Sequence, residues 1–197
     1  MVTWKKLLEI QSGPTPRHFH LAPEPESIRL ALQLILLDQP IEGAAADAEG
    51  FGGFGAIEVV LAERLENATG WVSARSGPEA QHIGYFGAST GAAAALVAAA
   101  RLPKIVEAIV SRGGRPDLAG PSLEFVTAPT LLIVGEYDET VIELNQQAAA
   151  KLRGPHELVI VPRASHLFEE PGALEQVAYL ARLWFEDYLL GKKANVA

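Results

Sequence analysis

Short runs of aliphatic and β-branched residues alternate along the chain with longer segments in which apolar residues recur at helical spacing. The short runs predict strands at 32–38, 82–87, 105–111, 130–135 and 157–162. The longer segments predict helices at about 55–69, 90–101, 140–153 and 172–190. Such alternation favours crossover units, and the apolar strands suit a sheet that is covered on both faces. The pattern therefore predicts an α/β fold with a mostly parallel central sheet flanked by helices.

The last predicted helix carries apolar residues at three- and four-residue steps. They are Leu174, Val177, Ala178, Ala181 and Trp184. Because residues at this spacing share one face of a helix, we expect them to form one buried stripe.

Two segments of the first quarter of the chain predict loops. Residues 11–27 are rich in proline, which removes backbone donors and disfavours regular structure. Residues 44–55 end in GGFG, which we interpret as a flexible turn because no clear strand precedes it, as a phosphate-binding loop would require.

Length and composition indicate one globular domain spanning residues 1–197. Apolar residues make up 49% of the chain and charged residues 20%, which is typical of a protein with a packed core. The net charge of −8 argues against a nucleic-acid partner, because such binding depends on clustered Lys and Arg. The absence of Cys excludes disulfides, thiolate metal sites and a thiol nucleophile.

No membrane-directed segment is predicted. The opening residues MVTWKKLLEI lack the long apolar run of a secretion signal. The longest apolar stretch, 91–100, is shorter than the roughly 20 residues that a membrane-spanning helix needs. We therefore expect a cytoplasmic protein.

The most informative motif is Gly87-Ala88-Ser89-Thr90-Gly91, which lies where a predicted strand ends and a predicted helix begins. In this context a Gly-x-Ser-x-Gly motif forms a sharp turn, the nucleophile elbow, which exposes the serine hydroxyl above the sheet. An ordinary tight turn is the alternative, but the flanking strand and helix favour a nucleophilic Ser89. The Thr90 amide and the helix N-terminus would then face a developing oxyanion.

A serine nucleophile needs a base and an orienting acid, and candidates for both follow later strands. Asp138 comes after the strand predicted at 130–135, and His166 after the strand at 157–162. Because the carboxyl ends of parallel strands meet at one edge of a sheet, we expect Ser89, Asp138 and His166 to converge. Their order along the chain is also that of α/β hydrolases.

Neighbouring acids offer alternatives to these roles. Asp138 is also suited to cap the helix that follows it, and Glu136 is a second candidate for the orienting acid. Glu139 is expected at the start of that helix. Glu169 and Glu170 are expected to charge the first turn of the last helix.

The remaining histidines are weaker candidates for the base. His82 opens a strand, His156 precedes one, and His18 and His20 lie in the proline-rich loop. The last two lack acidic or Cys ligands at a metal-like spacing, so no metal site is predicted.

From about residue 82 onward the chain resembles dienelactone hydrolase-like α/β hydrolases in their serine form. The resemblance rests on GYFGASTGAAAALVAAA, IVSRGGRPDLAG, APTLLIVGEYDE, VIELNQ and ELVIVPRASHLFEEPG. It implies a hydrolase sheet, full or slightly reduced, and a metal-free, cofactor-free enzyme in which Ser89, Asp138 and His166 are nucleophile, acid and base. Dienelactone hydrolases proper use a Cys nucleophile, so its absence favours a serine esterase over an enzyme for dienelactones.

The resemblance is weaker at the N-terminus. Such hydrolases carry an HG-containing loop whose backbone supplies a second oxyanion donor, but Gln11 and Ser12 stand where His-Gly is expected. Pro14 and Pro16 have no N–H to donate, so Gly13 is the predicted donor. The opening strands are also shortened, which would expose a sheet edge and makes a homodimer plausible.

Arg112 and Arg115 follow a strand in the sequence SRGGRPD. Facing the cleft, they would hold a substrate carboxylate in a planar fork. The alternative is that both are solvated surface residues, and the sequence leaves this choice open.

Together these features predict a serine hydrolase that cleaves a small-molecule carboxylic ester or lactone through an acyl-enzyme. Two alternatives remain: a hydrolase-like binding or regulatory module with weakened catalysis, and a lactonase acting on acyl-lactone signals. The acyl-chain length is not set by these motifs, because specificity lies in the loops.

Overall fold

The structure, a computed structural model, describes residues 55–75 and 82–191. Within them, four strands form a parallel sheet in the order β1-β2-β3-β4. The strands are β1 (Ile83–Ala88), β2 (Val106–Arg112), β3 (Thr130–Gly135) and β4 (His156–Val161). The helices are α2 (Gly55–Arg75), α3 (Thr90–Arg101), α4 (Glu139–Ala149) and α5 (Ala173–Leu189), and a 3₁₀ segment, η2 (Pro116–Phe125), joins β2 to β3. The predicted α/β fold is confirmed, and the strand predicted at 32–38 lies outside the described residues.

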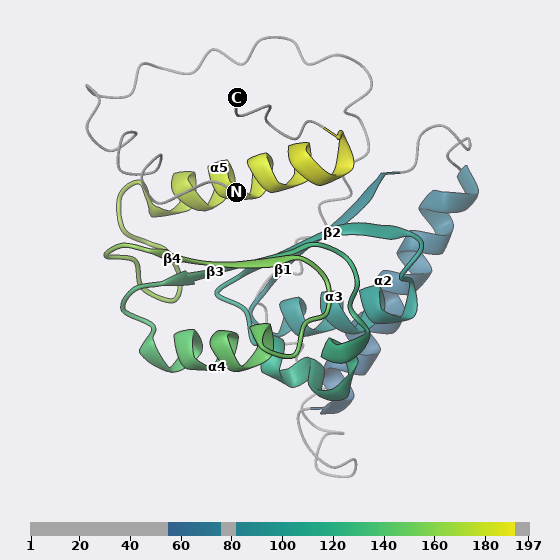
Figure 1. The fold of residues 1–197 in the computed structure, drawn as a ribbon, viewed down its shortest axis with the longest axis horizontal. Helices are drawn as coiled ribbons and strands as arrows, with labels where there is room; N and C mark the ends of the chain where they lie inside the picture. Colours follow the sequence, from purple (N-terminus) through teal and green to yellow (C-terminus); the bar gives the residue numbers. More distant parts are fainter. Residues whose placement is uncertain (1–54, 76–81, 192–197) are drawn as a thin grey trace.

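Helices cover both faces of the sheet: α5 lies over one face, and α2, α3 and α4 lie against the other (Figure 1). Successive residues of a strand point to opposite faces, so Ile109 and Val110 belong to different apolar clusters. The cluster that contains Ile109 lies between the sheet and α3, and the other lies beneath α5. In the part of the chain that the structure describes, no helix combines the length and apolarity needed to cross a membrane.

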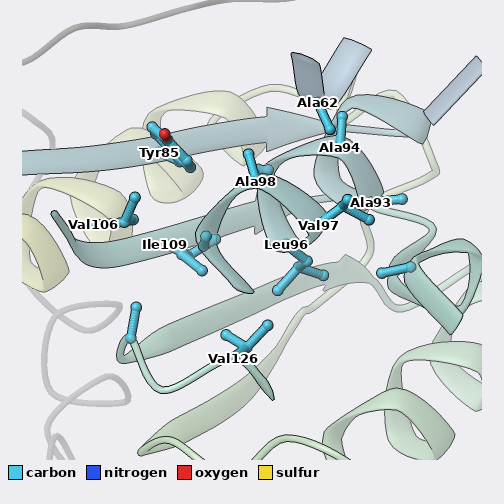
Figure 2. Close-up of a cluster of buried hydrophobic side chains, with 14 of the residues drawn as sticks. Ala62, Tyr85, Ala93, Ala94, Leu96, Val97, Ala98, Val106, Ile109 and Val126 are labelled. Atoms are coloured by element: carbon cyan, nitrogen blue, oxygen red, sulfur yellow. The ribbon is translucent and has the colours of Figure 1, made fainter. Parts of the chain in front are cut away.

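Helix α3 consists largely of alanine and is buried along almost its whole length. Ala93, Ala94 and Ala98 are fully buried among larger apolar side chains such as Leu96 (Figure 2). Such small side chains allow the helix backbone to lie close to its neighbours. This close packing fixes α3 directly behind the end of β1.

The buried face of α5 differs from the predicted stripe. Val177 and Ala181 are buried as predicted, but Leu174 is 49% exposed and Ala178 is also exposed. The buried positions are Ala173, Val177, Leu180, Ala181 and Leu189. Both stripes obey the helical repeat and share two residues, so spacing alone does not decide which row faces the sheet. Packing against the strands selects the row that begins at the first residue of the helix.

Because all four strands run in the same direction, their carboxyl ends lie at one edge of the sheet and their amino ends at the other. Ser89, Asp138 and His166 all follow the carboxyl ends of strands. His82 and His156 lie at the amino ends of β1 and β4, on the opposite edge. These two histidines are therefore far from the turn that contains the candidate nucleophile.

Candidate active site

Ser89 lies in the turn between β1 and α3 and has a backbone conformation that is rare for residues with a side chain. Its φ is 49° and its ψ is −127°. Such conformations cost about 1–3 kcal/mol and persist only where surrounding contacts hold them. The Ser89 carbonyl accepts hydrogen bonds from the amides of Ala92, at 3.1 Å, and Arg115, at 3.0 Å. The turn has the strand-turn-helix geometry of a nucleophile elbow.

Gly87 explains why the chain can turn so tightly here. A Cβ at Gly87 would lie 2.6 Å from the Cα of Ala92 and from the carbonyl oxygen of Gly91. Both atoms belong to the backbone of the first turn of α3, so no side-chain movement would relieve the clash. Only glycine allows the strand end and the helix start to approach this closely.

Thr90 is the first residue of α3, so its amide has no hydrogen-bond partner within the helix. The start of a helix also carries a partial positive charge. The Ser89 side chain does not cap the helix. A hydroxyl and a backbone donor therefore lie next to each other at the turn.

Asp138 and His166 come from loops after neighbouring strands and are joined directly by a hydrogen bond. The Nδ1 atom of His166 lies 2.5 Å from Oδ2 of Asp138. The side chain of Asp138 is 15% exposed and that of His166 is 40% exposed, so the acid is shielded while the imidazole remains accessible. Asp138 does occupy the N-cap position of α4, but its side chain makes no capping hydrogen bond.

Gly135, the last residue of β3, allows these two loops to meet. A Cβ at this position would lie 2.4 Å from the carbonyl oxygens of Ala164 and Ser165. The backbone just before His166 therefore passes directly over the end of the strand that precedes Asp138.

Between the Ser89 turn and His166 lies a short segment, here called the β2 loop, which consists of Gly113, Gly114 and Arg115. On one side, a Cβ at Gly113 would lie 3.0 Å from the carbonyl oxygen and 3.7 Å from Cε1 of His166. On the other side, a Cβ at Gly114 would lie 2.6 Å from the Cβ of Ala92 in α3. The Arg115 amide donates to Ser89. The β2 loop thus connects the Ser89 turn with His166.

Two carboxylates hold the loop that carries His166. Oε2 of Glu136 accepts the Arg163 amide at 2.6 Å, and Oε2 of Glu170 accepts the Ser165 amide at 3.0 Å. The second hydrogen bond lowers the pKa of Glu170 below its ordinary value. The prediction that Glu170 lies in the first turn of the last helix is wrong, because α5 begins only at Ala173 and the carboxylate turns back to the loop.

The two arginines after β2 have different environments. The guanidinium of Arg112 lies over the ring of Phe168, 5.5 Å from its centroid. The Nε and Nη2 atoms of Arg115 donate to the two carboxylate oxygens of Asp117, at 2.9 and 2.8 Å. This pairing raises the pKa of Arg115. The Arg115 guanidinium, which was predicted to hold a substrate carboxylate, is therefore already paired with the carboxylate of Asp117.

Asn145 is a buried polar residue near the site that the sequence analysis did not single out. It lies in α4, is 0% exposed, and its Nδ2 donates to the carbonyls of Gly114, at 3.0 Å, and Val141, at 2.8 Å. The sequence does contain a signal for its burial. Asn145 is four residues after Val141 and three before Ala148, so it shares the helix face of these two apolar residues, which are both buried.

Several predicted features lie outside the described residues. They are Gly13, the histidines His18 and His20, and most of the glycine-rich segment at 44–55. Within 55–75 and 82–191, no three His, Cys, Asp or Glu side chains gather as a metal ion would require.

Comparison with solved structures identifies similar folds. The chain is similar to a dienelactone hydrolase from Anabaena variabilis ATCC 29413, with 53% identity and a TM-score of 0.65 over 77% of this chain and 69% of that chain. It is also similar to the esterase domain of a Rhodothermus marinus protein, with 20% identity and a TM-score of 0.56 over 65% of this chain and 69% of that chain. The second likeness concerns the fold alone.

Curated relatives come from two strains of Mycobacterium tuberculosis, and each is named "Putative phosphoribosyl transferase". They are 60% identical to this chain over 132 residues, which is 67% of this chain. The match spans only 30% of each relative's length. No family model matches the sequence.

Proposed function

This chain belongs to the dienelactone hydrolase-like α/β hydrolases, and we propose that it is a serine hydrolase that cleaves a small-molecule carboxylic ester or lactone. The observation that carries the proposal is the combination of Ser89 in a strained strand-to-helix turn with the 2.5 Å hydrogen bond between Asp138 and His166. An ordinary tight turn requires neither the strain nor an acid–imidazole pair at the same sheet edge. Because the chain has no Cys, a serine supplies the nucleophile.

In the proposed reaction, the Ser89 hydroxyl attacks the substrate carbonyl and its proton passes to Nε2 of His166. Nδ1 is held by Asp138, so Nε2 is the nitrogen left for this transfer. Asp138 fixes the orientation of the ring and stabilises the imidazolium that forms. The bond to the leaving oxygen then breaks, that oxygen takes the proton from His166, and an acyl-enzyme remains. Water, deprotonated by His166, releases the acid and restores Ser89.

The negative charge that develops on the carbonyl oxygen needs fixed donors. We assign one donor to the Thr90 amide, because Thr90 is the first residue of α3 and its N–H has no partner within the helix. Gly13 remains the predicted second donor. The curated relatives bear the name of a transferase, but the match spans only 30% of their length. We therefore base the proposal on Ser89, Asp138 and His166 of this chain and not on that name.

The first test is the substitution Ser89→Ala, assayed with short p-nitrophenyl esters. Removing a nucleophile of this kind lowers kcat by a factor on the order of 10⁴ or more. The matched control is Ser122→Ala in η2, a half-buried serine that has no role in the proposed reaction. Wild-type turnover by a folded Ser89→Ala protein would refute the proposal.

A fluorophosphonate reagent distinguishes an enzyme from a hydrolase-like binding module. It reacts with a serine that is activated by a base, so we expect rapid labelling of the wild-type protein and loss of labelling in His166→Ala. A well-folded wild-type protein that is not labelled would favour the binding module. A panel of esters and acyl-lactones then separates an esterase from a lactonase.

A further inference from the structure

We infer that Asn145 is a positioning residue for this site and that it acts through the β2 loop. The inference rests on the proposed function, because positioning has meaning only if Ser89 and His166 react together. Asn145 itself touches neither of them in any hydrogen bond of the structure.

The first step is the link between α4 and the β2 loop. Nδ2 of Asn145 donates to the Gly114 carbonyl at 3.0 Å, across 31 positions of sequence. The same helix begins directly after Asp138, which occupies its N-cap position. One side chain therefore ties the helix that follows the candidate acid to the loop that follows β2.

The second step is the contact of the β2 loop with the other two candidate residues. At one end, the amide of Gly113 donates to the Ile133 carbonyl in β3 at 2.8 Å, and a Cβ at Gly113 would lie 3.0 Å from the carbonyl oxygen of His166. At the other end, the amide of Arg115 donates to the Ser89 carbonyl at 3.0 Å. A displacement of Gly114, the middle residue, therefore shifts both the residue that lies next to the His166 backbone and the residue that is bonded to the serine turn.

The third step is what the amide group of Asn145 supplies at this buried position. Among the residues that the structure describes, neither Oδ1 of Asn145 nor the hydroxyl of Ser111 has a hydrogen-bond partner, and both atoms are buried. Burying such atoms is unfavourable, and an apolar side chain of similar size would avoid that cost at Asn145. An apolar residue cannot donate to the buried Gly114 carbonyl, so Asn145 both satisfies that carbonyl and fixes its position.

The loop also has little freedom to take another position. A Cβ at Gly114 would lie 2.0 Å from Oγ of Ser111 and 2.6 Å from the Cβ of Ala92. Gly114 thus lies closely between β2 and α3, and its carbonyl accepts the hydrogen bond from Asn145.

The test compares Asn145→Leu with a matched control, Thr130→Val. Thr130 is also buried and also donates to a backbone carbonyl, that of Ala128 at 3.0 Å, but it lies at the amino end of β3 on the opposite sheet edge. Misplacing reacting groups by a fraction of an ångström lowers turnover, so we expect kcat of Asn145→Leu to fall roughly 10- to 100-fold with KM unchanged. The rate of fluorophosphonate labelling should fall by a similar factor, and Thr130→Val should retain both values.

A second variant covers the case in which Asn145→Leu does not fold. In Asn145→Ser the hydroxyl can still bond the Val141 carbonyl within the helix, but it is too short to reach Gly114. The same loss of kcat is expected. A folded Asn145 variant with wild-type kcat, or equal losses in Thr130→Val, would overturn the positioning role. Ser89→Ala, assayed alongside, reports separately on the proposed function, because that proposal fails only if Ser89→Ala remains active.

Discussion

Replacing Gly135 by alanine should create a local clash that lowers both the stability of the fold and kcat. The new Cβ would lie 2.4 Å from the carbonyl oxygens of Ala164 and Ser165, whereas real Cβ contacts are rarely below 3.0 Å. The backbone before His166 must therefore move by about 0.6 Å, away from the strand that precedes Asp138. If the whole shift falls on the Asp138–His166 hydrogen bond, it lengthens from 2.5 Å to about 3.1 Å.

Overpacking of this kind costs about 1–3 kcal/mol. For a chain of this length each kcal/mol lowers Tm by about 2–4 °C, so we expect a decrease of roughly 2–12 °C by calorimetry. The displaced imidazole should lower kcat by roughly 10- to 100-fold on a p-nitrophenyl ester.

Gly154→Ala provides the matched control. Its Cβ would lie 2.5 Å from the carbonyl oxygen of Thr127, also a backbone atom, but at the amino edge of the sheet. This variant should lose a similar amount of stability and keep kcat. If Gly135→Ala and Gly154→Ala lose stability equally and both retain wild-type kcat, the proposed dependence of the site on this close approach is refuted.

Two further predictions concern stability. Glu170 has a pKa lowered from 4.5 by the Ser165 amide, so its contribution is present above pH 4.5 and is lost as the pH falls through the lower pKa of the folded state. Glu170→Gln should therefore reduce the acid-induced decrease in Tm below pH 4.5, and an unchanged profile of Tm against pH would contradict this. Thr69→Val leaves the buried Tyr85 hydroxyl without its 2.7 Å partner and should cost about 1–3 kcal/mol in chemical denaturation. The double variant with Tyr85→Phe should recover part of this loss, and strictly additive losses would argue against the pair.

Much of the fold was predictable because buried parallel strands are continuous apolar runs. The strand at 130–135 and the helix at 90–101 have the predicted bounds, and the other described strands differ by one residue at each end. The 3₁₀ segment at 116–125 was not predicted, because Pro116 and Pro121 suggest a loop and the segment is kinked at Gly120, where φ is 52°. The buried row of α5 depended on a choice between two stripes that the sequence pattern satisfies equally.

The candidate site was also predicted only in part. Motif and order along the chain predicted which residues follow the carboxyl ends of the strands, and the structure joins Asp138 to His166. The role of the β2 loop was not predicted. Its glycines allow other segments to approach closely, and the sequence does not show which segments these are. The partner of Arg115 was equally hidden, although Asp117 is only two positions away.

The alanines of α3 reverse the usual logic of a mutational scan. Truncation to alanine changes nothing at Ala92, Ala93 or Ala94, which are already 0% exposed and have no methylene to lose. Enlargement to Val or Leu is the informative change, because it forces the helix axis outward. Since the same helix begins at Thr90, the space around its alanines also limits which sequences the Ser89 turn can tolerate.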